Sequence, residues 1–253
     1  MFRSVFFRNL LAGVLALTAP MAYASDAVAN ETWEWGGALY LWGAGIGGTT
    51  AEGDDIDVSF NDIIDNLDMA FMGVLQAQKG KWTLLADVIY LDVSAGQTST
   101  ANIIGRPVSA NVDVGLKSWI VTPAAAYEVH KTDTTRLSIL GGGRYLYMDA
   151  DLDFAIPAIA LREKYSDSGS VIDAIIGARG ELRLNEKWYV NYHVDICTGE
   201  SDVTWQALAG LNYRFSKVDA AFGYRYLKWE FDDDDTFDEL DISGPYAGIR
   251  FSF

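Results

Sequence analysis

The chain has 253 residues, of which 50% are hydrophobic and 13% aromatic. This is enough apolar material for one large folded domain or two small ones, which excludes a mostly disordered chain. The net charge of −16 excludes a nucleic-acid partner, because a phosphate backbone requires a basic surface. A single cysteine, Cys197, and two histidines, His130 and His193, exclude a disulfide framework and a metal or redox centre rich in Cys or His.

Residues 1–24 have the pattern of a secretory signal peptide. Arg3 and Arg8 provide the positive beginning, residues 10–17 form an apolar segment too short to span a bilayer, and Ala22-Tyr23-Ala24 is an A-x-A cleavage site. Cleavage after Ala24 leaves residues 25–253 as one domain. Its net charge is −18, because the removed segment has two arginines and no acidic residue. An uncleaved membrane anchor is the alternative, which the short apolar segment disfavours.

No later segment has 18 consecutive apolar residues, so no transmembrane helix is expected after the signal peptide. Runs of about ten residues that alternate between apolar and polar recur instead, which is typical of membrane barrel strands. The clearest run covers residues 188–197. In a soluble sandwich its apolar face would point to a core, whereas in a barrel it points to lipid. Nine further strands are expected at 33–46, 71–78, 82–91, 112–129 with a shift of phase near Lys117, 137–147, 172–183, 203–215, 220–226 and 247–253.

The connections between these runs are alternately short and long, as the two ends of a membrane barrel require. The sequence therefore predicts an all-β fold: a closed antiparallel up-and-down transmembrane β-barrel of about ten strands, with both termini in the periplasm. Eight or twelve strands would require one hairpin to be merged or split. Short connections are expected at 79–81, 131–135, 185–187 and 216–217, and long ones at 47–68, 96–111, 153–169 and 232–239, while 199–202 is shorter than its side predicts.

The first long connection contains Ser59–Leu67, which has the pattern of a capped helix with Ser59 or Asn61 as the N-cap. A helix at this place could order the loop or plug the mouth of the barrel.

The last strand ends in aromatic residues on its apolar face, with Phe251 followed by the terminal Phe253. It resembles the C-terminal assembly signal of Gram-negative outer-membrane β-barrel proteins, which implies the outer membrane as location and the barrel-assembly machinery as a partner. The segments 33–42, 57–60 and 71–73 are similar to small barrels of the OmpA/OmpW-like type. That resemblance implies no particular activity.

Charged side chains on the inward faces are the first candidates for a functional site. A network of opposite charges can line a narrow aqueous path and set its ion preference. In a small barrel the same charges can pair and plug the interior, which is the interpretation we favour. The candidates for this lumen network are Asp87, Arg144, Asp173, Arg179, Glu181, Arg183, His193, Asp195, Arg214, Arg225 and Arg250.

His193 and Asp195 are two residues apart on one strand, so their side chains share a face at a spacing of about 7 Å. A histidine beside a carboxylate can activate water, as in the omptin proteases, which are ten-stranded barrels. This chain places no aspartate pair opposite His193, and neither histidine has a serine two residues away. We therefore expect no catalytic residues, and a barrel hydrolase is the alternative.

Acidic residues are concentrated in the first and the last long connections, which should be neighbours where the barrel closes. Carboxylate oxygens suit Ca²⁺ or Mg²⁺, so a weak divalent site is a hypothesis, and a solvated acidic rim is the simpler interpretation. No other cofactor is expected. The residues of this site would be Asp54, Asp55, Asp232, Asp233, Asp234 and Asp235.

Aromatic residues near both ends of the strands predict girdles at the two membrane interfaces, with Tyr226 and Trp229 among those expected at the outer one. The function predicted from the sequence is a monomeric, non-enzymatic barrel in contact with outer-membrane lipid and lipopolysaccharide. It would be structural or a narrow channel for ions or small solutes. A surface binding or adhesion module that acts through the acidic loops is a third possibility.

Overall fold

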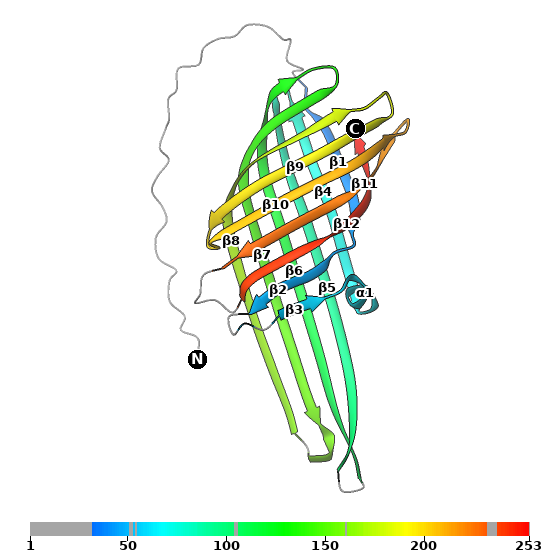
Figure 1. Cartoon of the computed structure of the whole chain (residues 1–253), viewed down its shortest axis with the longest axis vertical. Helices are drawn as coiled ribbons and strands as arrows, with labels where there is room; N and C mark the ends of the chain where they lie inside the picture. The colour runs from blue at the N-terminus through cyan, green and yellow to red at the C-terminus, as the bar shows by residue number, and fades with distance from the viewer. Residues whose placement is uncertain are drawn as a thin grey trace.

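A computed structural model describes residues 32–50, 53, 55–103, 106–159, 161–231 and 237–252. They form one antiparallel sheet in which β1 pairs with both β4 and β12, so the sheet closes. Ten strands make the barrel, and β2 and β3 add a hairpin at one end (Figure 1), which confirms the predicted fold class. The signal peptide predicted at 1–24 lies outside the described residues. The elements are β1 (Glu34–Trp42), β2 (Gly45–Thr50), β3 (Asp55–Val58), α1 (Phe60–Asp65), β4 (Leu67–Lys79), β5 (Trp82–Ile103), β6 (Arg106–Lys131), β7 (Thr135–Ile156), the 3₁₀ turn η1 (Pro157–Ile159), β8 (Leu161–Arg183), β9 (Trp188–Gly199), β10 (Val203–Arg214), β11 (Val218–Glu230) and β12 (Phe237–Ser252).

The two ends of the barrel differ in their connections. At the end where β1 begins and β12 finishes, here called the terminal end, the strands are joined by short turns (Figure 1). The β4–β5 turn is the tightest, with Lys79 paired to Trp82 and Gly80 at φ +58°, a conformation that glycine adopts without strain. The opposite end, here called the extended end, carries the β2–β3 hairpin, α1 and two long hairpins.

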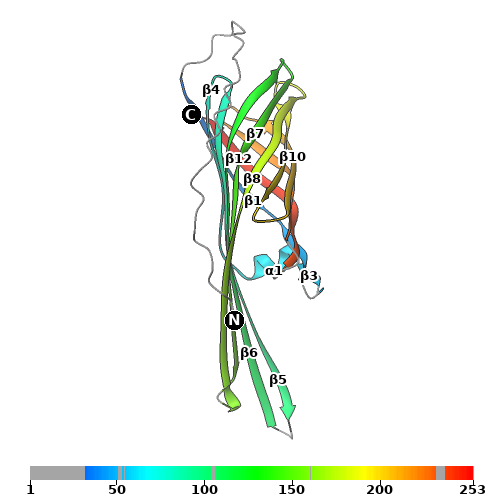
Figure 2. The same cartoon turned by 90° about the vertical axis from the view of Figure 1, so that its left-hand side faces the viewer.

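The predicted long loops at 96–111 and 153–169 are wrong, because most of these residues continue the strands. β5 and β6 remain paired as far as Ile103 and Arg106, and β7 and β8 as far as Ile156 and Leu161. The sequence does not alternate regularly between apolar and polar here, as in Thr98-Ser99-Thr100 and Arg162-Glu163-Lys164, so the pattern that predicts the barrel strands does not predict their continuation. The continued strands form a four-stranded sheet that projects far beyond the other strands (Figure 2). The short connection at 199–202 is confirmed, with only residues 200–202 between β9 and β10.

Two details of strand phase also differ from the prediction. The run 33–46 is divided at Gly43 and Ala44, where β1 ends and β2 begins, and both strands pair with β12. The expected irregularity of β6 near Lys117 is absent from the described pairing, and the register instead shifts between Glu128 and His130. This places the bulge at the terminal end of β6, just before the turn that leads to β7.

α1 confirms the helix expected in the first long connection. Ser59 is the N-cap, and it forms a capping box with Asp62. The helix lies at the rim beside β2 and β3 (Figure 2), and its only buried residue is Ile63, so it orders the loop and does not fill the lumen. None of the described helices is long and apolar enough to cross a membrane.

The outward face of the barrel is apolar between two aromatic levels. At the terminal end Trp82 packs on Tyr127, with 5.0 Å between ring centroids, and Trp188 packs on Tyr213. At the other level the pairs are Tyr90 with Trp119 and Trp205 with Tyr226. Side chains such as Leu39, Leu75, Ile139, Ile176 and Phe222 are exposed between these levels. Such a belt is what hydrocarbon requires of a barrel wall.

The placement of Trp229 in the outer girdle is wrong. Its side chain is completely buried and belongs to the apolar cluster inside the barrel. Tyr226 is three residues earlier and therefore lies on the opposite face of β11, as the period of two demands.

Inside the barrel, Tyr246 of β12 lies across glycines of the two preceding strands. A Cβ atom at Gly210 would be 2.0 Å from the Tyr246 hydroxyl oxygen, and one at Gly223 would be 2.7 Å from the ring and closer still to backbone atoms. The absence of a side chain at these positions lets the ring pack flat against the wall.

We predict that Gly210→Ala lowers the free energy of unfolding by about 1–3 kcal/mol, because the new methyl group displaces the Tyr246 ring from a packed position. Urea unfolding in detergent micelles, followed by the shift between folded and unfolded bands on a gel, measures this. Gly141→Ala is the control, since its Cβ would meet nothing closer than 3.7 Å. Equal stability of the two variants would contradict the packing role of Gly210.

Candidate functional site in the barrel lumen

The first polar cluster of the lumen is centred on a buried ion pair between β7 and β9. Arg144 Nη2 donates to both carboxylate oxygens of Asp195 at 2.9 Å, and both side chains are completely buried. His193 Nε2 lies 2.6 Å from Asp195 Oδ2, and Arg144 Nη1 also donates to Cys197 Sγ at 3.2 Å. Burying two charges is unfavourable unless each is paired and hydrogen-bonded, which this geometry achieves for the carboxylate.

The second cluster joins β1, β5 and β11 on the other side of the lumen. Arg225 Nη1 donates to Asp87 Oδ2 and to the Tyr40 hydroxyl, each at 2.9 Å. The Tyr40 hydroxyl donates in turn to Asp87 Oδ1 at 2.7 Å. The Arg225 guanidinium also lies 4.8 Å from the centroid of the Trp42 ring, a cation–π contact.

Gln206 of β10 connects these two clusters. Its Oε1 accepts from Arg225 Nε at 2.8 Å, and its Nε2 donates to Asp195 Oδ2 at 3.1 Å. Polar side chains from six strands therefore form one network across the middle of the lumen, from Asp87 to Arg144.

The remaining residues of the predicted lumen network lie outside this central network of hydrogen-bonded side chains. Asp173 accepts from the Ser201 backbone and hydroxyl and from Thr204, at 2.7–3.0 Å, near the β9–β10 turn. Arg250 pairs with Glu181 at 3.2 Å, and Arg214 lies 3.9 Å from Asp219, both toward the terminal end. Arg179 also lies there, with its Nη2 3.4 Å from Gln76 Oε1. Arg183 is exposed at the end of β8 and does not line the cavity described next.

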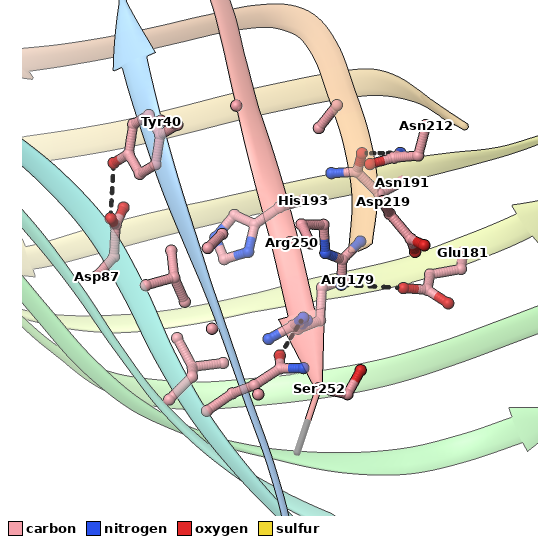
Figure 3. Close-up of a pocket in the computed structure, with 18 of the residues that line it drawn as sticks. Tyr40, Asp87, Arg179, Glu181, Asn191, His193, Asn212, Asp219, Arg250 and Ser252 are labelled. Atoms are coloured by element: carbon pink, nitrogen blue, oxygen red, sulfur yellow. Dashed lines mark hydrogen bonds and ion pairs between the residues drawn. The ribbon is translucent and has the colours of Figure 1, made fainter. Parts of the chain in front are cut away.

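A cavity of about 410 Å³ occupies the terminal half of the lumen. It reaches from mouth residues such as Glu34 and Lys217 to the central network at Tyr40, Asp87 and Arg225. Figure 3 shows Arg179, Arg250 and His193 arranged around its interior, with Glu181 and Asp219 at one side. Its size suits a small molecule or ion.

An apolar layer closes the lumen beyond the central network. Four of its members follow a network residue by two positions on the same face: Trp42 after Tyr40, Ile89 after Asp87, Leu146 after Arg144 and Leu227 after Arg225. Because strand residues two apart face the same side, the two sets form stacked layers. Leu227 and Trp229 are completely inaccessible, and of the ten residues in this layer, which we call the apolar plug, only Tyr246 touches the cavity. The plug consists of Trp42, Ala44, Met72, Ile89, Ile120, Leu146, Leu227, Trp229, Leu240 and Tyr246.

His193 and Asp195 do meet, as their spacing predicts. Four side chains, those of Arg144, His193, Gln206 and Cys197, already contact the Asp195 carboxylate. Among the described residues, no serine, threonine or cysteine is within hydrogen-bond distance of the His193 ring. The Cys197 thiol lies beside the pair but is buried and donates to Asp195 Oδ1, so the His193 ring has no nucleophile among the described residues as its own hydrogen-bond partner.

Several lumen residues were missed at the sequence level. Tyr40 and Trp42 belong to a run whose phase was uncertain, and Ile89, Ile120 and Leu146 make the inner faces of their strands look mixed. Gln206 and Thr204 were placed on the inward face, but nothing in their spacing indicates their partners.

The hypothetical divalent site lies mainly outside the described residues, which include only Asp55 of its six. The strands that flank its two halves are nevertheless neighbours, because β12 pairs with β2 and β2 with β3. Within the described ranges, no three His, Cys, Asp or Glu residues are close enough to hold a metal ion. The site remains a prediction. The assembly signal is likewise described only for Phe251, in β12.

The projecting part of β5–β8, here called the sheet extension, comprises residues 91–103, 106–118, 148–156 and 161–171. One face, continuous with the lipid-facing wall, carries ion pairs: Lys117 with Asp92, Lys164 with Asp151, and Arg162 with Asp153. The hydrogen bond from Arg162 lowers the pKa of the Asp153 carboxyl, since it favours the ionised form. This charged face is therefore suited to contact with water and not with lipid.

The opposite face of the extension is continuous with the lumen wall and is mainly apolar, with Glu163 and Asp167 of β8 as its exposed charged residues among those described. Met148 and Val171 at its base pack against the apolar plug. Farther out, Val114 is 45% and Tyr165 62% exposed. The polarity of the two faces thus changes beyond the second aromatic level. The face that is apolar and contacts lipid in the barrel becomes charged in the extension, and the face that lines the lumen in the barrel becomes mainly apolar. The described apolar side chains of this face are Leu91, Val93, Ala95, Val112, Val114, Leu116, Met148, Ala150, Leu152, Phe154, Ile156, Leu161, Tyr165 and Val171.

Solved structures with a similar chain path include three membrane barrels. Ail, the attachment invasion locus protein of Yersinia pestis, has 10% identity and a TM-score of 0.36, covering 87% of this chain and 98% of its own. The translocator domain of the autotransporter NalP from Neisseria meningitidis has 12% identity and a TM-score of 0.42, covering 87% of each chain. The toluene transporter TodX of P. putida has 12% identity and a TM-score of 0.31, covering 87% of this chain and 89% of its own.

No protein-family model matches the sequence, and no curated protein matches it. All three TM-scores are below 0.5, so these structures do not determine the class of the protein. The class is instead inferred from the geometry of this chain. The ten strands of the barrel form a closed sheet, so every backbone N–H and C=O group inside hydrocarbon can be hydrogen-bonded to a neighbouring strand. The apolar belt between two aromatic levels suits the lipid around it. The chain is a transmembrane β-barrel protein.

We predict that Asp195→Ala lowers the free energy of unfolding by about 3–5 kcal/mol, because Arg144 is left buried without a counter-charge. The double variant Arg144→Met/Asp195→Leu should recover much of this loss, and Asp153→Ala, at an exposed pair, should change nothing measurable. Urea unfolding in micelles measures all three. An Asp195→Ala barrel as stable as the wild type would contradict the account of the buried pair.

The apolar plug predicts that the wild-type barrel gives no conductance steps in planar bilayers. Trp42→Ala/Trp229→Ala removes the two largest side chains of the plug and should produce discrete steps. Leu84→Ala, on the lipid-facing side of β5, is the control and should stay silent. Steps of equal size in the wild type and the double variant would contradict closure by the plug.

Proposed function

We propose that this protein is a non-enzymatic surface-binding module, in which the closed barrel anchors the sheet extension and the extension binds a protein partner. The observation that carries the proposal is the uncovered apolar face of the extension. Contiguous exposed apolar surface is uncommon on proteins without a partner and marks interaction sites. The proposal locates binding in the projecting strands, not in the acidic loops.

The proposal includes the orientation of the barrel. Short turns face the periplasm and long projections face outward in outer-membrane barrels. The terminal end is accordingly periplasmic, and the extension stands in the extracellular space. From Leu91 to Ile103 the extension spans about 40 Å at the usual rise of a strand. It can therefore reach beyond the lipid surface.

The edges of the extension favour a polypeptide as the partner. β4 pairs with β5 only as far as Val93, and β9 pairs with β8 only as far as Asp173. Beyond Ser94 on β5 and Ile172 on β8, no described strand pairs with the outer edge. Unpaired backbone groups at a sheet edge recognise another strand by β-augmentation, which a lipid or sugar cannot provide.

The size of the face is also suitable. Four strands about 4.8 Å apart, with about ten residues each beyond the rim, offer roughly 600 Å². Standard protein interfaces bury about 800 Å² on each partner, so the face with one edge is close to a complete binding surface.

The lumen supports this proposal because it offers neither an open path nor an activated nucleophile. The apolar plug separates the cavity from the extended end. Among the described residues the His193 ring has no hydroxyl or thiol partner, and the buried Cys197 thiol donates to Asp195 Oδ1 at 3.5 Å. A narrow channel remains the second candidate, favoured by the charged cavity, and it would require the plug to move.

Adhesion of cells that display the protein tests the proposal. The probes are wells coated with fibronectin or collagen, and sister cells in a sedimentation assay. The shortened variant joins Ala95 to Val114 and Asp151 to Ser166, two cross-strand pairs, each through Asn-Gly. We expect the wild type to adhere to at least one probe and the shortened variant to lose that adhesion.

Two point variants refine the test. Val114→Ser/Tyr165→Ser alters the apolar face and should reduce adhesion at least about tenfold. Asp151→Ala/Lys164→Ala alters the ion-paired face and should leave it unchanged. Gel shifts on heating show whether each variant is folded. Equal adhesion of wild type and shortened variant to every probe, or no adhesion of either, would overturn the proposal.

A further inference from the structure

The lumen cavity is locally cationic in a strongly acidic protein. Its lining has six basic residues and five acidic ones, whereas the whole chain has a net charge of −16. The basic residues are Arg136, Arg179, Arg214, Lys217, Arg225 and Arg250, and the acidic ones are Glu34, Asp87, Glu128, Glu181 and Asp219.

Four of these carboxylates each have an arginine of their own. Asp87 pairs with Arg225 at 2.9 Å, Glu128 with Arg136 at 3.1 Å and Glu181 with Arg250 at 3.2 Å. The fourth, Asp219, lies 3.9 Å from Arg214 and also accepts from the Tyr189 hydroxyl at 2.5 Å. The fifth, Glu34, lies at the beginning of β1.

Arg179 is the arginine of the cavity that has no carboxylate within ion-pair distance among the described residues, and the nearby Glu181 forms its ion pair with Arg250. Its single described hydrogen bond is from Nη2 to Gln76 Oε1, at a long 3.4 Å. A guanidinium has five N–H donors, so most of its donors are unused by the protein. Figure 3 shows its nitrogen atoms directed into the cavity, next to Arg250 and below His193.

The surroundings of Arg179 are equally rich in donors. His193 is its direct cross-strand neighbour on β9. Arg250 Nη2 donates to Glu181 Oε1 at 3.2 Å, and Arg250 Nη1 donates to the Tyr189 hydroxyl at 3.3 Å. Arg250 and Arg136 repel the Arg179 guanidinium and only Glu181 among its described charged neighbours attracts it, so an anion bound beside Arg179 would be favourable.

We propose that Arg179 is the centre of a binding site for a small oxyanion, a carboxylate or a phosphate, that enters the cavity from the terminal end. A planar guanidinium binds two oxygens of one anion side by side, which a carboxylate or phosphate provides and a halide does not. The site lies four residues from the end of β8 and thus about 13 Å from the mouth. It is distinct from the surface-binding role and does not depend on it.

Calorimetric titration of the refolded barrel in an uncharged detergent tests the site. The titrants are inorganic phosphate, acetate, succinate and chloride, which separate the two oxyanion classes from a spherical ion. We expect saturable binding of at least one oxyanion, with chloride at least about tenfold weaker. Equal binding of chloride, or no oxyanion binding in the wild type, would overturn the proposal.

Two variants on one strand provide the matched comparison. Arg179→Gln removes the charge within the cavity and should weaken the oxyanion at least about tenfold. Arg183→Gln removes the same charge four residues nearer the mouth, outside the cavity lining, and should leave binding unchanged. An unchanged affinity in Arg179→Gln, or an equal loss in Arg183→Gln, would contradict the assignment.

A measurement on the wild type covers the case in which Arg179→Gln does not fold. Phenylglyoxal modifies accessible guanidinium groups, and mass spectrometry of the digested protein locates the modified arginines. The bound oxyanion should protect Arg179 and leave Arg183 reactive. Equal labelling of Arg179 with and without the oxyanion would overturn the proposal.

Discussion

Closure of the sheet between β1 and β12 is the constraint on which the rest of the structure depends. Inside a bilayer no water can satisfy an unpaired N–H or C=O group, so a β-structure can span hydrocarbon only when its first and last strands pair. Seven pairs, from Gly36 with Ser252 to Trp42 with Tyr246, make this seam. Once it is closed, the period of two assigns every side chain of the barrel wall to lipid or to the lumen. The buried ion pairs, the plug and the cavity all follow from that division.

The lumen shows how a narrow barrel uses its interior. Arg144, Asp195, Arg225 and Asp87 would be costly to bury singly, but Gln206 links their two pairs into one network across six strands. The apolar plug is stacked directly on that network, so water reaches it from the terminal end only. The cavity is the part of the lumen that remains. Its unmatched Arg179 is the exception in an interior where the other arginines have partners.

The alternation of apolar and polar residues was enough to predict the closed barrel, its ten strands and the face of nearly every inward charge. It could not predict the sheet extension, because serine, threonine and aspartate are common in both loops and strands bordered by water. It also could not place Trp229, since an aromatic residue near a strand end suits either a girdle or a plug. The arginine partners of two carboxylates in the network lie more than 50 positions away along the chain, Arg144 for Asp195 and Arg225 for Asp87. Such contacts leave no local signal.

The pairing of β1 with β12 can be measured directly by cross-linking. In a Cys197→Ser background, Leu39→Cys/Ile249→Cys places two thiols on directly opposed, lipid-facing positions of the seam. We predict that mild oxidation of the folded barrel forms an intramolecular disulfide in this variant. Tyr40→Cys/Ile249→Cys, in which one thiol faces the lumen, should form none. Equal cross-linking of both variants, or disulfides only between molecules, would contradict a barrel closed by these two strands.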